Sequence, residues 1–144
     1  GMHLESLGVR MERHCANALA VAKWLDADPR VSWVSFPGLE TDKYHALAEK
    51  YMPNGTCGVI SFGVPGGREK VSAFLDHLKM VSIATHVADA RSCTLYPAGT
   101  THRQLTEEQL VEAGVGIDLV RLSCGIENAD DIITDLDQAL AAVQ

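Results

Sequence analysis

The stretch Asp118-Leu-Val-Arg-Leu-Ser-Cys124, followed closely by Asn128, Asp130 and Asp131, decides the fold class of this chain. Its apolar and β-branched content predicts a strand. Asn128 and the two carboxylates predict the capped start of a helix. That helix carries an apolar stripe of Ile132, Ile133, Leu136, Leu140 and Val143. A strand followed directly by an amphipathic helix indicates a domain in which helices pack on a sheet.

The same two patterns extend upstream through the rest of the chain. They predict helices over 7–25, 42–51, about 67–78 and 106–114, and strands over 31–36, 57–64, 81–85 and 93–96. Thr106 and Gln109 have the spacing of a capping box, and Gly114 can provide a left-handed helix end. The irregular order of elements predicts an α+β fold, a two-layer sandwich with a small mixed or antiparallel sheet and helices on one face.

Composition limits the classes of function that the chain can have. It has 144 residues, 47% of them hydrophobic, and a formal net charge of -7. Because its basic residues are dispersed, nucleic acid and anionic membranes are poor partners. No apolar run is long enough to cross a membrane. The four cysteines lie far apart in apolar stretches, so we expect reduced thiols in a cytoplasmic protein.

Few residues suggest a catalytic or metal site. Histidines and cysteines lack the paired spacings of a metal site, and no nucleophile motif is present. Arg121 interrupts an apolar strand, on the same face as Leu119 and Ser123. Its guanidinium fork suits a carboxylate, although a solvent-facing arginine on a half-exposed sheet is the alternative. Ser92 precedes a strand and has turn chemistry as its alternative.

Seven segments, in order along nearly the whole chain, strongly resemble O-acetylhomoserine sulfhydrylases, which are pyridoxal-phosphate (PLP) enzymes of the Cys/Met metabolism family with fold type I. They are Arg10-Met-Glu-Arg-His-Cys-Ala-Asn-Ala-Leu19, Trp33-Val-Ser-Phe-Pro-Gly-Leu-Glu40, Tyr44-His-Ala-Leu-Ala-Glu-Lys-Tyr51, Gly58-Val-Ile-Ser-Phe-Gly63, Asp89-Ala-Arg-Ser92, Tyr96-Pro-Ala-Gly-Thr-Thr-His-Arg-Gln-Leu-Thr106 and Val120-Arg-Leu-Ser-Cys-Gly-Ile-Glu127. The resemblance is to roughly the last third of such an enzyme.

The resemblance implies a place in the parent enzyme and roles for three residues. Residues 1–144 would be a single C-terminal domain, with the large PLP-binding domain absent. Arg121 would bind the α-carboxylate of O-acetylhomoserine, Ser92 would line the same amino-acid site, and Thr101 would border the pocket. No catalytic, cofactor-binding or metal-binding residue is expected in this domain.

Two departures from the family pattern bear on this site. Ala88 stands where the family has a glycine, which restricts the backbone near Ser92. The family also forms its Schiff base through a lysine in a Ser-x-Thr-Lys setting, and none of the five lysines, Lys23, Lys43, Lys50, Lys70 and Lys79, has that context. PLP is therefore expected in the parent enzyme and not on this chain, which by itself is predicted to be inactive.

The parent reaction implied by the resemblance is γ-replacement of acetate by sulfide or a thiol in methionine and cysteine metabolism. The partners would be the amino-acid substrate, the large domain and further copies in a homo-oligomer. γ-Synthases and lyases of the family share the arginine motif. The alternative is a free-standing, non-catalytic module that serves assembly or partner binding.

Overall fold

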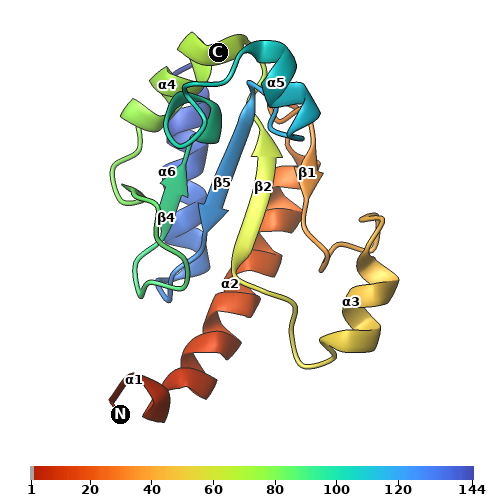
Figure 1. The fold of residues 1–144 in the computed structure, drawn as a ribbon. Coiled ribbons are helices and arrows are strands. Elements are labelled where there is room, and N and C mark those ends of the chain that lie inside the picture. Colours follow the sequence, from red (N-terminus) through yellow and green to blue (C-terminus); the bar gives the residue numbers. More distant parts are fainter. Residues whose placement is uncertain (1) are drawn as a thin grey trace.

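The computed structural model, which describes residues 2–144, is a five-stranded sheet with its two longest helices packed on one face (Figure 1). The elements are, in chain order, α1 (Met2–Glu5), α2 (Leu7–Ala27), β1 (Val34–Ser35), α3 (His45–Tyr51), β2 (Val59–Gly63), α4 (Gly67–Asp76), β3 (Ser82–Ile83), β4 (Cys93–Leu95), the 3₁₀ turn η1 (Pro97–Gly99), α5 (Glu107–Glu112), β5 (Leu119–Ser123) and α6 (Ala129–Ala141).

The sheet is mixed and places the last strand of the chain at its centre. Its order is β1-β2-β5-β4-β3, with β3 and β4 parallel and the other neighbours antiparallel. In this register Arg121 of β5 lies between Ser61 of β2 and Leu95 of β4. Directly opposed residues share a face of the sheet, so these three side chains lie on the same side.

One face of the sheet packs on α2 and α6, which lie behind the strands in Figure 1. Ile60 and Phe62 of β2, with Val120 and Leu122 of β5, are fully buried in one hydrophobic cluster with the apolar stripes of the helices. Phe62 meets Phe74 of α4 edge to face, with ring centroids 6.1 Å apart. The predicted α+β sandwich with helices on one face is confirmed.

The helix caps also follow the prediction, whereas two elements near β1 are shorter than predicted. Thr106 and Gln109 form the capping box, and Asn128 accepts a hydrogen bond from the N–H of Asp130. Residues 31–36 pair over only two positions, because the chain turns on both sides of them. The carboxylate of Asp42 accepts hydrogen bonds from backbone N–H groups on both sides of it, so α3 begins three residues later than predicted.

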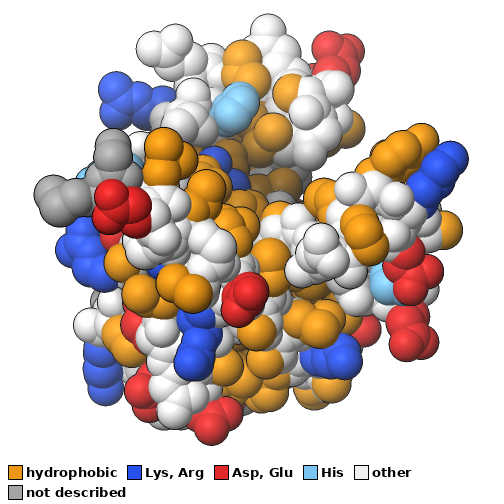
Figure 2. Space-filling model, turned by 90° about the horizontal axis from the view of Figure 1, so that it is seen from below, with side chains coloured by type: hydrophobic (Ala, Val, Ile, Leu, Met, Phe, Trp, Pro, Cys, Tyr) orange, Lys and Arg blue, Asp and Glu red, His pale blue; other side chains and the backbone are white. Residues whose placement is uncertain are grey.

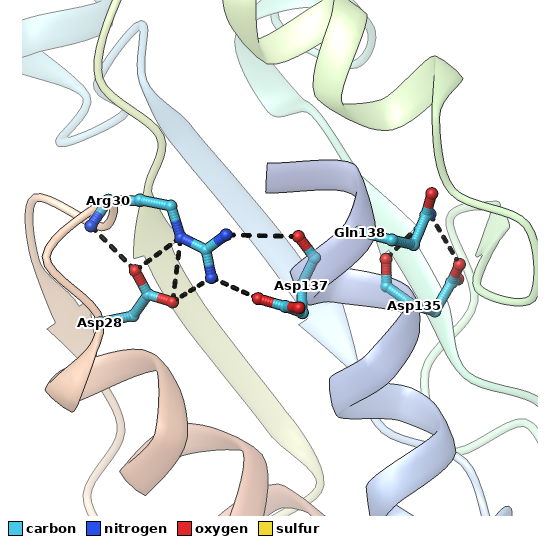
Figure 3. A network of polar contacts seen from close by, with 5 residues as sticks. All are labelled: Asp28, Arg30, Asp135, Asp137 and Gln138. Carbon is cyan, nitrogen blue, oxygen red and sulfur yellow. Dashed lines mark hydrogen bonds and ion pairs between the residues drawn. The ribbon is translucent and has the colours of Figure 1, made fainter. Parts of the chain in front are cut away.

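An ion-pair network ties the end of α2 to α6 (Figure 3). Arg30 contacts Asp28 and Asp137, each at 2.5 Å. Hydrogen bonds from Arg30 lower the pKa of Asp28 below its ordinary value, although burial by itself would raise it. The network therefore holds the two helices together at the edge of the core.

A second anchor joins α6 to the segment between α4 and β3. The carboxylate of Asp135, only 5% exposed, accepts hydrogen bonds from the backbone N–H groups of Lys79, Met80 and Val81 at 2.8, 2.9 and 2.8 Å. Gln138 also donates to it, at 3.1 Å (Figure 3). One side chain thus satisfies three donors of a turn that has no helix or sheet partner for them.

Candidate functional site

Arg121 projects from the central strand toward the sheet face that the helices leave uncovered. It shares that face with Leu119 and Ser123, since Val120 and Leu122 point into the core. The predicted alternation along this strand is therefore confirmed. Arg121 as a residue is half-buried, and its Nη2 donates a long, solvent-exposed hydrogen bond of 3.5 Å to the carbonyl oxygen of His86.

The charge on Arg121 has no carboxylate counter-ion among residues 2–144, in contrast to Arg30 and its two aspartates. A guanidinium without a counter-ion among these residues can pair with a bound anion. Its planar fork is suited to a carboxylate in two-point contact. The geometry therefore makes Arg121 a candidate anion-binding group.

Helix α2 holds the segment that follows β5. Nδ1 of His14 lies 2.6 Å from the carbonyl oxygen of Cys124. The amide of Asn17 donates to the carbonyl oxygens of Gly125 and Glu127, at 3.0 and 2.8 Å. His14 and Asn17 are buried, so these hydrogen bonds are shielded from water. They fix the end of the strand that carries Arg121.

Ser92 connects the start of β4 to the same segment. Its side chain is fully buried, donates to Oε2 of Glu127 at 3.0 Å and accepts from the N–H of Gly125 at 2.8 Å. Its backbone N–H donates to Oε1 of Glu127 at 2.6 Å. A Cβ on Gly125 would lie 2.3 Å from Oε2 of Glu127 and 2.5 Å from the carbonyl oxygen of Ala90, so no side chain fits there. Ser92 therefore orders the loop beside Arg121.

Thr101 lies apart from these two residues, after η1 and beyond the opposite end of β4 from Ser92. Its side chain is exposed, and its hydroxyl lies 2.8 Å from Nδ1 of the adjacent His102. Arg121 thus lies on β5 and Ser92 directly precedes the neighbouring β4, and no hydrogen bond joins Arg121, Ser92 and Thr101 to one another among residues 2–144.

The loop between β3 and β4 borders Arg121 and contains backbone strain. Ala88 has a φ of 57°, in the left-handed region that a side chain disfavours. Its N–H donates to Oγ of Ser123 at 3.1 Å, which holds it there. Asp89 accepts a hydrogen bond from the N–H of Arg91 and lies 3.2 Å from His86, and these contacts lower the pKa of Asp89. The loop is therefore held in a defined conformation beside β5.

Three polar residues of this site, His14, Asn17 and Glu127, were not singled out from the sequence. His14 and Asn17 are three residues apart on α2. The apolar stripe of this helix was sufficient to predict its buried face, so the two polar residues within it were not considered. Two strongly polar side chains at helical spacing within that face were the available signal. Their partners are more than a hundred residues away, so the pattern alone could not identify them.

A small cavity of about 130 Å³ lies beside the end of β5, between α2 and the loop that contains Ala88. It is lined by Met11, His14, Cys57, Gly58, Val59, Val87, Ala88 and Ser123. A larger cavity, of about 520 Å³, lies between α2 and α3, and Arg121 does not line it. Figure 2 shows this end of the molecule, where hydrophobic side chains gather over α3 and around a hollow beside it.

Metal-binding and membrane-spanning features can be checked over the described part of the chain. Within residues 2–144 no three or more His, Cys, Asp or Glu side chains are grouped in a way that could hold a metal ion. None of the helices described there combines the length and the apolar character that a membrane span requires.

Comparison with known proteins gives consistent matches. Residues 2–141 match the family model described as Cys/Met metabolism PLP-dependent enzyme. The homocysteine synthase of Schizosaccharomyces pombe is 50% identical over 137 residues, which are 95% of this chain and 32% of that protein. The O-acetyl-L-homoserine sulfhydrylase of Leptospira meyeri is 47% identical over 138 residues, 95% of this chain and 31% of that protein.

A crystal structure from Campylobacter jejuni that contains N'-pyridoxyl-lysine-5'-monophosphate matches with a TM-score of 0.90 and 39% identity. The match covers 97% of this chain and 33% of that one. The chain therefore spans about a third of the length of the relatives it matches.

Proposed function

We propose, since this chain belongs to the family of Cys/Met metabolism PLP-dependent enzymes, that residues 1–144 form the C-terminal, substrate-carboxylate-binding domain of an O-acetylhomoserine sulfhydrylase. The observation that carries the proposal is Arg121, at the centre of the sheet and without a carboxylate partner among residues 2–144. The parent enzyme would be a cytoplasmic homo-oligomer.

In this proposal the domain binds and orients the amino-acid substrate, O-acetylhomoserine. Arg121 holds the α-carboxylate through its two-pronged fork. Ser92 and Glu127 keep the adjoining loop in place, and Thr101 borders the pocket from beyond the far end of β4. The bound cofactor of the parent supplies the electron sink for replacement of acetate by sulfide or a thiol. Fixing the carboxylate limits how the substrate can turn toward that cofactor.

The lysines of the chain do not fit the role of the cofactor lysine. Lys23, Lys43, Lys50 and Lys79 are exposed, and Lys70 is half-buried on α4. Lys43 and Lys50 lie over the rings of Tyr44 and Tyr51, with Nζ 4.8 and 5.0 Å from the ring centroids. No lysine is among the residues that line the small cavity beside the end of β5. We propose that PLP is held by a part of the parent enzyme outside these residues and that the chain alone is inactive.

Titration of the purified chain with PLP tests this assignment. The sample is reduced with borohydride after each addition, and the labelled peptides are mapped. The expected result is slow, non-stoichiometric labelling spread over the exposed lysines. Stoichiometric labelling of one lysine, with a visible absorption band, would mean that the chain carries its own cofactor site and would overturn the proposal.

The carboxylate role is tested by following the side-chain N–H signals of Arg121 by NMR during titration with O-acetyl-L-homoserine. We expect a saturable shift that the corresponding carboxamide does not produce. Arg121→Gln should remove the response, whereas Arg91→Gln, on the exposed loop nearby, should leave it unchanged. Equal responses to acid and amide would contradict a carboxylate site.

A second candidate function is an assembly or partner-binding module derived from the same domain. The exposed apolar side chains of Leu47 and Tyr51 on α3, and of Tyr44 directly before it, favour it, since contiguous apolar surface promotes association. The gene context discriminates the two candidates. An upstream frame that encodes the cofactor domain supports the enzyme, and an unrelated upstream gene supports the module.

A further inference from the structure

The cavity of about 520 Å³ between α2 and α3 has the dimensions of a small-molecule site, since such sites usually measure about 300–1,000 Å³. Its walls are one side of α2, one side of α3 and the segment 52–56 that follows α3. Leu19 and Ala48 contribute apolar surface. At Gly55, φ is 130° and an added Cβ would lie 3.1 Å from the side chain of Cys15. A glycine at this position therefore keeps the wall clear of α2.

Two carboxylates line this cavity without a lysine or arginine beside them. Glu12 lies on α2 and Glu49 on α3, and no lysine or arginine is among the lining residues. Lys43 and Lys50, at and just before α3, lie instead over tyrosine rings. Among residues 2–144 neither glutamate forms an ion pair with a lysine or arginine. A ligand that complements the charge of this cavity is therefore a cation.

His45 presents a hydrogen-bond acceptor beside one of these carboxylates. Its Nδ1 lies 2.9 Å from the carbonyl oxygen of Pro37, which can only accept, so in a neutral ring Nδ1 carries the hydrogen and Nε2 accepts. Nε2 lies 3.6 Å from Oε1 of Glu49, which is too long for a hydrogen bond. The side chains of His45 and Glu49 are 25% and 72% exposed, so a ligand can reach both. One ammonium group, which has three donors, can satisfy both acceptors.

We infer that this cavity binds a small organic cation, a primary ammonium ion on an apolar body. The ammonium group donates to Nε2 of His45 and to Oε1 of Glu49, and Glu12 adds attraction from the α2 side. The apolar body packs on the apolar wall that α2 and α3 form. Arg121, which suits the opposite charge, does not line this cavity. The inference therefore goes beyond the proposed function, and neither depends on the other.

The test is a titration of the isotope-labelled chain with benzylamine, followed through the imidazole nitrogens of His45 and the methyl groups of Ala16 and Ala48. Benzyl alcohol, which has the same body without the charge, and benzyltrimethylammonium, which has the charge without an N–H donor, serve as matched probes. At the binding efficiency of drug-sized ligands, benzylamine reaches a dissociation constant of about 20 mM or tighter. We expect saturable shifts with benzylamine, weaker binding of benzyltrimethylammonium and no saturation with benzyl alcohol.

Equal affinity for benzylamine and either matched probe, or no saturation with benzylamine, would overturn the inference. Shifts of the same signals when the chain is concentrated without amine would assign the cavity to a second copy of the chain and would also overturn it. The signals of Arg121 should stay unchanged throughout. A response of Arg121 to O-acetyl-L-homoserine without a benzylamine response removes the cation site alone, and the reverse removes the carboxylate site alone.

Two variants locate the binding. Glu49→Gln should weaken benzylamine binding about twofold to fivefold, whereas Glu69→Gln, in the exposed first turn of α4, is the matched control and should leave it unchanged. Ala16→Phe should fill the cavity and abolish the response, and α2 should tolerate it because Ala16 is exposed. A response that persists in folded Ala16→Phe would place binding elsewhere and overturn the inference. The three probes on the unaltered chain decide the matter if that variant does not fold.

Discussion

Replacing Asp135 by Asn tests whether this carboxylate stabilises the fold as its contacts indicate. The charged side chain accepts three backbone hydrogen bonds of 2.8 to 2.9 Å in a buried setting. The asparagine amide keeps one acceptor oxygen and points an NH₂ group at a backbone donor. Hydrogen bonds to charged groups contribute about 1.5–3 kcal/mol each. With partial relaxation, we expect the free energy of unfolding to fall by about 3 kcal/mol.

The same effect should depend on pH in a defined direction. Burial alone would raise the pKa of Asp135, but the backbone donors and Gln138 outweigh it and lower the pKa below its ordinary value. The contribution to stability is therefore complete above about pH 4, the pKa of an unfolded aspartate, and is lost as the pH falls through the folded pKa. The difference between the parent chain and Asp135→Asn should shrink in acid.

Urea unfolding followed by far-ultraviolet circular dichroism, at neutral pH and in steps toward pH 3, measures both effects. Asp26→Asn is the matched control, because Asp26 is exposed and has no hydrogen bond recorded in residues 2–144. It should shift stability by less than about 0.5 kcal/mol. A change of that small size for Asp135→Asn at neutral pH would refute the reasoning.

Three further perturbations have expected outcomes. Ala88→Gly should raise the free energy of unfolding by about 0.5 kcal/mol. Glycine relieves the left-handed strain of about 1–2 kcal/mol, and this gain exceeds the entropy cost of ordering a more flexible unfolded chain. A lower urea midpoint would contradict this prediction. Burial raises the pKa of Cys124 to about 12, so iodoacetamide at pH 8 should modify half-buried Cys57 before it and reach Cys124 only on unfolding. Gly125→Ala should destabilise the folded chain by about 3 kcal/mol or more, since its Cβ would clash with Glu127 and the Ala90 carbonyl. An unchanged thermal midpoint would contradict this and show that the loop can shift to make room.

Local patterns were sufficient for the elements that depend on local chemistry. The apolar stripe of α6 and its Asn128 cap, like the capping box at Thr106, require contacts only within a few residues. Strand alternation alone placed Arg121 opposite the core face. Where competing local contacts exist, as at Asp42, the pattern overestimated the length of the element.

The identity of the parent family, the sheet face of Arg121 and the helix caps were thus determined by the sequence itself. Only the tertiary structure decided what surrounds the arginine. It brought His14 and Asn17 to the end of β5, paired Ser92 with Glu127 and buried Nε2 of His14 without a hydrogen-bond partner among the described residues. The physical reason is that these contacts join residues up to 110 positions apart, and such pairs are selected by packing and desolvation of the whole domain, not by local spacing.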